Sequence, residues 1–313
     1  MKQMNILRSL AKSLPHPILY RLYHHKRFRE EIGRTSAVAL RTGLPLLESL
    51  DLARLKTSDT LFVLGSAGSI NEISDEKWQI IGRHDSVGIN FWPVHQFVPR
   101  FFTFENIPHD WHPAMYKIFL SLLERRANAY ANTVKIITEV KSLEPKQVVF
   151  DLPENFRKNL YLGFSMPVAA RNEEELRTGI CYLRKLGAFT PRDHVSWLFK
   201  YGGSVTAMMA LGAVMGYKRI VLCGVDLNKQ NTFYNDRERY PECRDWDFIS
   251  PKEVHVTARR LPWLVPAQSA VRILKELILD PLGIELYVEN RISTLYPEIP
   301  LAPQSLFEEL AIH

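Results

Sequence analysis

The chain has 313 residues, of which 46% are hydrophobic and 24% charged, and these values exclude a largely disordered protein. Its length suits one large α/β domain with a small appendage, or two modest domains. The formal net charge is +6, and residues 1–34 alone hold eight Lys or Arg against Glu30 and Glu31. Because the remainder is close to neutral, the charge is local, and we expect no nucleic-acid partner.

The cysteine content argues against a secreted protein. Cys181, Cys223 and Cys243 form no CxxC pair and show no metal-ligand spacing. Such a sparse, odd count favours a reducing compartment over a disulfide framework. No apolar run reaches the roughly 18 residues of a membrane-spanning helix, and the N-terminus lacks the pattern of a signal peptide. We therefore expect a cytoplasmic protein.

Residues 3–33 predict one or two helices, interrupted at Pro15 and Pro17. The second helix has an apolar stripe beside basic side chains. The stripe consists of Ile18, Leu19, Leu22 and Tyr23, and the basic residues are Arg21, His24, His25, Lys26 and Arg27. Such a segment can dock peripherally on the anionic inner face of a membrane. It can equally pack its stripe on the domain behind it and leave the basic face in solvent.

The rest of the chain alternates short apolar strands with helices. Strands are predicted at 60–65 (TLFVLG), 86–91 (SVGINF), 100–104 (RFFTF), 133–138, 219–223 and 284–288 (IELYV). Helices are predicted at 115–129, 172–187, 205–215 and 267–279. Residues 228–262 are polar and aromatic and predict a long loop or lid. Residues 290–313 contain Pro297, Pro300 and Pro303 and predict a loosely packed tail.

This alternation predicts an α/β fold with a doubly wound, mostly parallel, Rossmann-like sheet. Four segments follow from it along the chain. They are a basic amphipathic helical segment (1–50), a nucleotide-binding α/β domain (51–227), a lid (228–265), and the completion of the domain with a C-terminal tail (266–313).

Small and polar residues gather where the predicted strands end, which is where ligands bind in such sheets. The turn 65–69 (GSAGS) separates a strand from an expected helix start, so its N–H groups and the helix dipole could hold a phosphate. It matches neither GxGxxG nor the Walker A motif, and a tight turn that needs small residues explains it equally well. Asn90, Asn106 and Asp226 stand at or just beyond other strand ends, and Asp226 either caps the next turn or faces a ligand.

A second small-residue turn, Gly202-Gly203-Ser204, precedes the helix predicted at 205–215. It is a second candidate anion site, although Ser204 could simply cap the helix. Two such turns at one sheet edge would suit a nucleotide phosphate and a further acidic group on the same ligand.

Two blocks of the chain carry a resemblance to a known family. Residues 61–73 (LFVLGSAGSINEI) with 86–91 form the first block, and residues 203–234 (GSVTAMMALGAVMGYKRIVLCGVDLNKQNTFY) form the second. In order and spacing they resemble glycosyltransferase family 42 sialyltransferases. The same framework occurs in MptE-like pterin diphosphokinases and in Maf-type flagellin glycosyltransferases.

The resemblance implies an inverting glycosyltransferase that takes an acidic sugar from a CMP-activated donor and needs no metal ion or other cofactor. The sugar would be a sialic acid, Kdo or a related nonulosonate, and the acceptor a glycolipid or polysaccharide, as in lipopolysaccharide biosynthesis. Gly65, Ser66, Gly68 and Asn90 would hold the nucleotide, with Ala67 in the same turn. Gly203 and Ser204 would lie near the donor carboxylate, and Tyr234 would stabilise the departing phosphate. The chain has no DxD motif, so hydroxyls and helix N-termini would meet the leaving-group charge.

The chain departs from the family pattern at the catalytic histidine, which would fall near Leu264 or Val265. The nearest histidine is His255 in the predicted lid. Transfer needs a base for the acceptor hydroxyl, and a histidine is suited to that role. Arg259 and Arg260 could bind a phosphate or carboxylate. Alternatively, His255 and both arginines are solvated lid residues.

Two other functions stay open. An MptE-like pyrophosphokinase on this framework would require Mg²⁺ and ATP. A non-catalytic nucleotide-binding protein would explain the missing family histidine. The sequence leaves the sugar, the linkage and any homo-oligomer undetermined.

Overall fold

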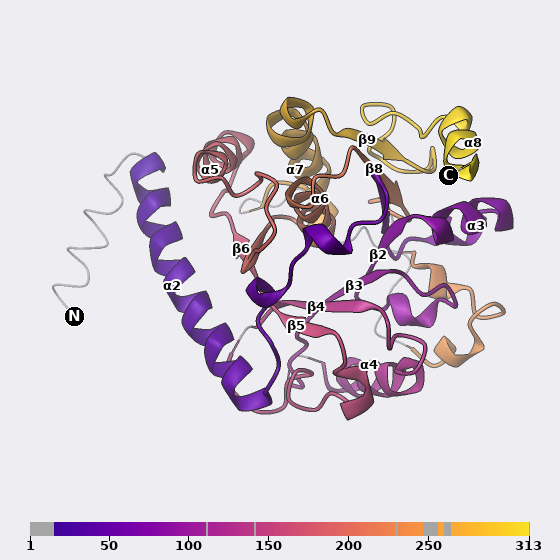
Figure 1. The fold of residues 1–313 in the computed structure, drawn as a ribbon, viewed down its shortest axis with the longest axis horizontal. Coiled ribbons are helices and arrows are strands. Elements are labelled where there is room, and N and C mark those ends of the chain that lie inside the picture. Colours follow the sequence, from indigo (N-terminus) through magenta and orange to yellow (C-terminus); the bar gives the residue numbers. More distant parts are fainter. Residues whose placement is uncertain are drawn as a thin grey trace.

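The centre of the molecule is a parallel sheet with the strand order β5-β4-β3-β2-β1-β8-β9 (Figure 1). The computed structural model describes residues 16–110, 112–140, 142–228, 231–246, 256–259 and 264–312. The strands are β1 (Thr60–Leu64), β2 (Asp85–Ile89), β3 (Phe101–Glu105), β4 (Val134–Glu139), β5 (Leu160–Leu162), β8 (Arg219–Cys223) and β9 (Glu285–Val288). Beside it, β6 (Phe164–Pro167) and β7 (Trp197–Lys200) form a small parallel sheet.

Helices cover both faces of the main sheet (Figure 1). One face carries α3 (Asp75–Arg83), α4 (Pro113–Arg126) and α8 (Gln304–Ile312). The other carries α5 (Glu173–Lys185), α6 (Ser204–Val214) and α7 (Ala267–Leu274), which continues as a π-helical turn over Lys275–Leu279. The prediction of a doubly wound α/β fold is therefore confirmed.

The apolar runs of the sequence become strands that are buried on both sides. In β1, Leu61 and Val63 belong to the core under α6, whereas Phe62 and Leu64 belong to the core under α3 and α4. Successive strand side chains point to opposite faces, so a strand covered on both faces needs a continuous apolar run instead of an alternating one.

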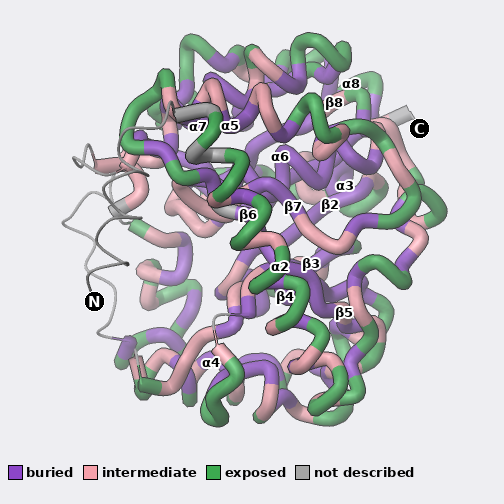
Figure 2. The backbone as a smooth tube through the Cα atoms, turned by 90° about the vertical axis from the view of Figure 1, so that its left-hand side faces the viewer, coloured by how far each residue is buried: buried purple, intermediate pink, exposed green. Residues whose placement is uncertain are grey.

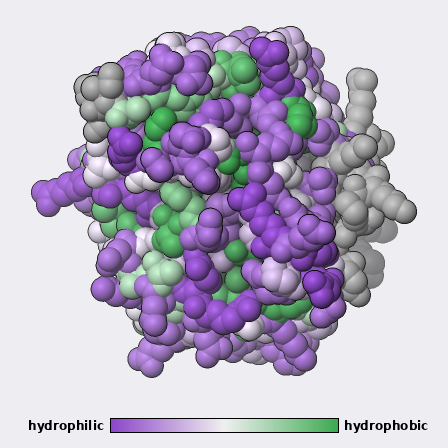
Figure 3. Space-filling model, turned by 90° about the vertical axis from the view of Figure 1, so that its right-hand side faces the viewer, coloured by the Kyte–Doolittle hydropathy of each residue, from purple (hydrophilic) through white to green (hydrophobic). Residues whose placement is uncertain are grey.

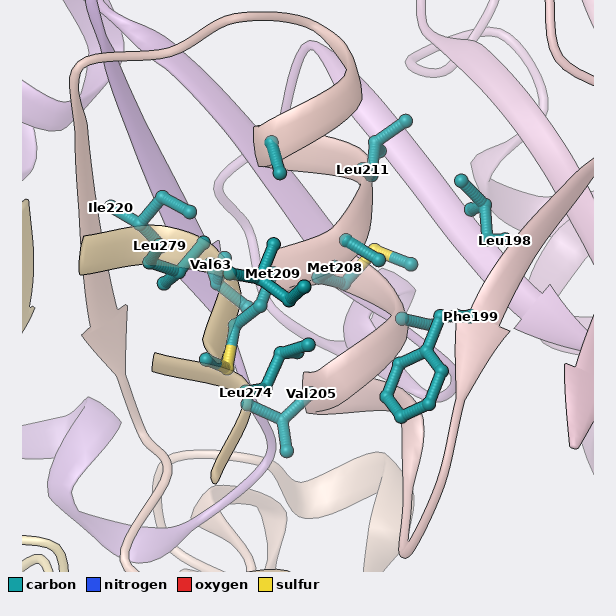
Figure 4. Close-up of a cluster of buried hydrophobic side chains, with 14 of the residues drawn as sticks. Val63, Leu198, Phe199, Val205, Met208, Met209, Leu211, Ile220, Leu274 and Leu279 are labelled. Carbon is teal, nitrogen blue, oxygen red and sulfur yellow. The ribbon is translucent and has the colours of Figure 1, made fainter. Parts of the chain in front are cut away.

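Helix α6 is the most enclosed of the described helices (Figure 4). Every residue from Val205 to Val214 is buried, and its side chains meet those of the main sheet and of β7. At Gly212 an added Cβ would lie 2.6 Å from the Ile220 side chain, so the helix can lie close to β8 only with glycine there. A helix that is apolar all round needs such enclosure, and its N-terminus is thereby held at one place on the sheet edge.

The strand order reverses between β1 and β8, since β2 to β5 lie on one side of β1 and β8 and β9 on the other. Gly65 follows β1, and Gly224 follows β8 with φ +63°. An added Cβ on Gly65 would lie 2.4 Å from the Gly224 carbonyl oxygen, so only glycine lets the two strand ends approach this closely. In doubly wound sheets this reversal point is where ligands bind.

Three predicted elements differ in the structure. The N-terminal helix α2 (His16–Thr42) continues well beyond residue 33. No α-helix begins directly at the 65–69 turn: a 3-10 turn over Gly68–Glu72 comes first, and α3 begins only where Ser74 caps the Lys77 amide. The prediction of a loosely packed tail at 290–313 is wrong, because the prolines come before α8 and do not prevent this helix. Its i, i+1, i+4 apolar stripe (Leu306, Phe307 and Leu310) is buried in the core.

The predicted lid is described only in part. Residues 231–246 form two 3-10 turns, Phe233–Asn235 and Pro241–Cys243, which pack aromatic side chains on the core. A third 3-10 turn, Val256–Ala258, contacts α7. Within the described part of the chain, no helix combines the length and apolar character needed to cross a membrane.

Candidate functional site

A cavity of about 390 Å³ opens at the carboxyl edge of the sheet, beside the point where the strand order reverses. Its walls come from the segments after β1, β2, β7 and β8, from the end of β3, and from the predicted lid. The lining residues are Gly65, Ser66, Ala67, Ile89, Asn90, Glu105, Gly202, Gly203, Ser204, Val205, Gly224, Val225, Asp226, Leu227, Asn231, Thr232 and Thr257. This size lies in the range of small-molecule sites.

Both small-residue turns open on this cavity. Gly65, Ser66 and Ala67 line it from the turn after β1, and Gly203 and Ser204 line it from the start of α6. The prediction that the two turns meet at one edge of the sheet is confirmed. Their meeting depends on β1 and β7 both ending at that edge.

The turn after β1 does not form the predicted phosphate cradle. Its amides donate within the chain: Gly65 to the Cys223 carbonyl (2.8 Å), Ala67 to that of Gly224 (3.0 Å) and Gly68 to that of Asn231 (2.9 Å). The Ser69 amide donates to Asp226, so within 65–69 only the Ser66 amide lacks an acceptor among the described residues. Gly68 does not line the cavity; an added Cβ there would meet the Asn231 amide at 2.8 Å.

The start of α6 is the stronger candidate for an anion site. Gly203 occupies the N-cap position with φ +136°, and no side chain caps the helix among the described residues. Ser204 is the first helical residue instead of the cap, so the capping interpretation of Ser204 is wrong. An uncapped N-terminus leaves its first N–H groups without acceptors and carries the positive end of the helix dipole. Because Gly203, Ser204 and Val205 line the cavity, this end faces it.

A charged cluster supports the wall beside α6. Lys200 at the end of β7 donates to Glu105 (2.5 Å) and to Glu139 (3.1 Å), and the Ser204 hydroxyl donates to the same Glu105 oxygen (3.3 Å). Burial acts to lower the pKa of Lys200, but the two carboxylates outweigh it and hold the pKa above its ordinary value. Lys200 therefore stays charged and places Glu105 at the cavity wall.

Of the neighbouring residues Glu105 and Asn106 at the end of β3, only Glu105 lines the cavity. Asn106 is fully buried, where it donates to Gln147 (2.5 Å) and accepts from the Val149 amide (3.0 Å). Its assignment as a ligand-binding residue is wrong, because neighbouring residues at a strand end point to opposite faces. The sequence places both at the strand end and offers no signal to choose between them.

Asp226 lines the cavity in a buried position after β8. The Ser69 hydroxyl donates to its carboxylate at 2.5 Å and the Ser69 amide at 3.3 Å. Burial raises the pKa of Asp226, and the bonds from Ser69 offset only part of that rise. Asp226 therefore faces the cavity, but its carboxylate holds the turn after β1 instead of capping the turn that follows it.

Asn90 is placed by an unusual backbone conformation. It follows β2 with φ +53°, a left-handed value that asparagine tolerates better than most residues. Its side-chain oxygen accepts from the Glu105 amide (3.4 Å), which ties the ends of β2 and β3 together. Asn90 lines the cavity, as predicted.

Tyr234 does not reach the cavity. Its ring packs against Phe91 (6.1 Å between centroids) and Trp246 (5.6 Å), and burial raises its pKa above the ordinary value. The prediction that it meets the departing phosphate is wrong, because its aromatic ring is buried in the core. Among the described residues of the predicted lid, the polar ones that line the cavity are Asn231, Thr232 and Thr257, for which the sequence has no motif.

The predicted base and arginine pair are only partly placed. His255 and Arg260 lie outside the described residues. Arg259 is partly exposed and is not among the residues that line the cavity, although Thr257 two positions earlier is. Among the described residues, no three His, Cys, Asp or Glu side chains are grouped to hold a metal ion.

The fold and site define an α/β protein with a cavity at the reversal point of a parallel, Rossmann-like sheet. Comparison with models of known families and with curated proteins finds no match for the chain.

Proposed function

We propose that the cavity binds a nucleotide-activated acidic sugar and that the protein transfers this sugar to an acceptor. The specific form is an inverting, metal-independent glycosyltransferase using CMP-activated sialic acid, Kdo or a related nonulosonate on a bacterial surface glycan. The observation that carries the proposal is the uncapped N-terminus of α6, which opens on a cavity at the sheet's reversal point.

The donor's negative charge would lie at Gly203, Ser204 and Val205, where backbone N–H groups and the helix dipole favour an anion. The nucleoside would reach toward Asn90 and Asn231, whose amides suit the polar edges of a base or ribose. An acidic sugar brings a second negative charge, which the Ser66 amide and hydroxyl are placed to meet.

In such a transfer the acceptor oxygen bonds to the anomeric carbon as the bond from that carbon to the phosphate oxygen breaks. The acceptor proton passes to a base, and the electron pair of the broken bond leaves with CMP. Asp226 is a candidate base, because its pKa is raised and it lies at the cavity wall. His255 remains the other candidate, and the N–H groups of α6 would stabilise the departing phosphate.

One observation favours a second candidate function. Glu105 and Asp226 bring two carboxylates to the cavity that has the anion site. Carboxylates beside phosphates are the usual ligands of Mg²⁺, as an ATP-dependent pyrophosphokinase would require.

A ligand screen tests both functions. The full chain is heated with CMP, CDP, UDP, GDP or ATP, each with Mg²⁺ or with EDTA. At about 100 times its dissociation constant a ligand adds about 2.7 kcal/mol, or about 5 °C in melting temperature. The transferase proposal expects stabilisation by CMP that EDTA does not remove, followed by turnover of CMP-sialic acid or CMP-Kdo.

Stabilisation by ATP that depends on Mg²⁺ would instead indicate the pyrophosphokinase. Stabilisation by CMP with no hydrolysis or transfer from any CMP-sugar would indicate a non-catalytic nucleotide-binding protein. Either result would overturn the transferase.

A further inference from the structure

Helix α2 buries one face and leaves the other without a partner in the described part of the chain. His24, Glu31, Thr35 and Val38 are buried against the domain. The opposite face exposes large apolar side chains. These are Ile18 (45% exposed), Leu22 (59%), Ile32 (40%) and Leu40 (88%). At 100° per residue these four lie within about 80° of arc.

The basic side chains of α2 lie on two different faces of the helix. Arg27 and Arg34 turn to the packed side, where they bind the buried Glu31 at 2.8 Å and 3.3 Å. Basic side chains share this exposed face: His25 and Arg29 lie between the apolar ones, and Arg21 and Lys26 lie at its two margins. All four lie within about 80° of the face's centre, whereas no acidic residue of α2 falls in that arc.

A groove between α2 and α5 extends the basic surface. Its cavity of about 390 Å³ has three basic side chains, Arg21, Arg177 and Lys185, and one acidic side chain, Glu174, in its walls, and Arg177 also binds Glu276 at 2.6 Å. The Arg21 guanidinium lies 5.7 Å from the centroid of the Tyr182 ring on α5. Ile18 and Leu22 lie on one side of Arg21 on α2, so the apolar face begins beside the groove.

Exposed apolar side chains are concentrated on this side of the molecule. Of the nine large hydrophobic residues exposed in the described chain, four lie on α2. Leu186 ends α5, and the Leu143 carbonyl accepts from Arg41 of α2 (2.5 Å). Figure 2 faces this side, and exposed residues recur along α2. On the opposite side, apolar residues form small patches separated by hydrophilic ones (Figure 3).

We propose that the exposed face of α2, with the α2–α5 groove beside it, docks on an anionic lipid bilayer. The helix lies in the plane of the interface, with its leucine and isoleucine side chains at the boundary of headgroups and acyl chains. Arg21, Lys26 and Arg29 contact anionic headgroups, and the groove accepts one headgroup phosphate. This surface is independent of the transferase proposal, because docking requires no donor.

Charge distinguishes the bilayer from a second copy of the chain. A twofold contact through α2 would place a positive face against itself, and like charges at an interface oppose association. An anionic bilayer supplies the opposite charge over an area large enough for a helix of 27 residues.

The test is co-sedimentation of the full chain with phosphatidylcholine vesicles, with or without about 30% phosphatidylserine. We expect binding only to the anionic vesicles, falling as salt is raised. Arg29→Gln should weaken that binding on the order of fivefold. Leu22→Ser combined with Leu40→Ser should weaken it further, with the melting temperature unchanged because both side chains are exposed.

Two matched controls lie away from α2. Leu282→Ser removes a leucine that is 44% exposed, and Arg54→Gln removes an exposed arginine; both should bind like the wild type. Equal binding by the α2 variants and the controls would overturn the proposal, as would no binding to anionic vesicles at low salt. A lipid-free dimer that Leu22→Ser dissociates would assign the face to a second copy and overturn it too.

Discussion

The hydroxyl of Ser69 donates to the carboxylate of Asp226 at 2.5 Å, and this bond joins the turn after β1 to the turn after β8. The two residues are distant in sequence, yet both lie where the strand order reverses. Burial raises the pKa of Asp226 because it disfavours the charged carboxylate, and an uncharged amide of the same shape would avoid this cost.

Asp226→Asn should therefore stabilise the fold at neutral pH while it lowers activity. With a folded-state pKa above the unfolded value, the carboxylate's contribution to stability decreases as pH rises through that interval. The amide has no such titration, so its melting temperature should equal or exceed that of the wild type at pH 7. If Asp226 is the base, turnover should fall at least about 100-fold with little change in donor binding. Unchanged turnover would exclude Asp226 as base.

Ser204→Asp should weaken donor binding without unfolding α6. A carboxylate at the first helical position favours the helix dipole, but it repels an anionic ligand and lies beside Glu105. We expect donor affinity to fall by at least about tenfold in calorimetric titration. Gln304→Asp makes the same kind of change at the first position of α8, away from the cavity, and should leave binding unchanged. Equal binding by the two variants would exclude the α6 anion site.

Lys200→Met should destabilise the site by about 2 kcal/mol, since it leaves Glu105 and Glu139 without their shared cation. Adding Glu139→Gln removes one of the two carboxylates and should restore part of the loss. Urea unfolding of the single and double variants measures this coupling. If the double variant loses the sum of the unfolding free energies lost by the two single variants, the residues are not coupled and the charged cluster is contradicted.

His95 should make the protein less stable in mild acid. Burial, then Arg239 and Arg126, lower its pKa from 6.5 to about 4, so the folded chain keeps this ring neutral. Between those pH values the unfolded chain binds a proton that the folded chain does not, and stability falls as pH falls by up to about 3 kcal/mol. His95→Gln should show a flatter profile of unfolding free energy from pH 6.5 to 4. Parallel profiles would contradict this.

Gly65→Ala should destabilise the protein by about 1–3 kcal/mol, because the new methyl group meets the Gly224 carbonyl at 2.4 Å. Gly33→Ala is the matched control on α2, where nothing lies within 4 Å of an added Cβ, and it should be stabilising by about 0.5–1 kcal/mol. Thermal unfolding of both variants measures the difference.

The sequence alone determined the class of the fold and six of the seven strands of the main sheet. Continuous apolar runs such as 60–65 and 219–223 are buried on both faces, so their periodicity predicts parallel strands without knowledge of their neighbours. The helix at 205–215 and the glycines before it could also be predicted, because a local sequence pattern determines local structure. That the strand ends share one edge followed from parallel pairing.

The tertiary structure decided which residues face the cavity. Glu105 lines the cavity and Asn106 does not, because the register between β3 and its neighbours decides which face of the sheet each side chain points to. One sequence does not specify that register. Tyr234 packs in an aromatic core against Phe91, which is distant in the chain. Four of the five amides in the 65–69 turn donate to Cys223, Gly224, Asp226 and Asn231. Such long-range contacts decide the direction of a side chain and the partner of an N–H group, and no local pattern encodes them.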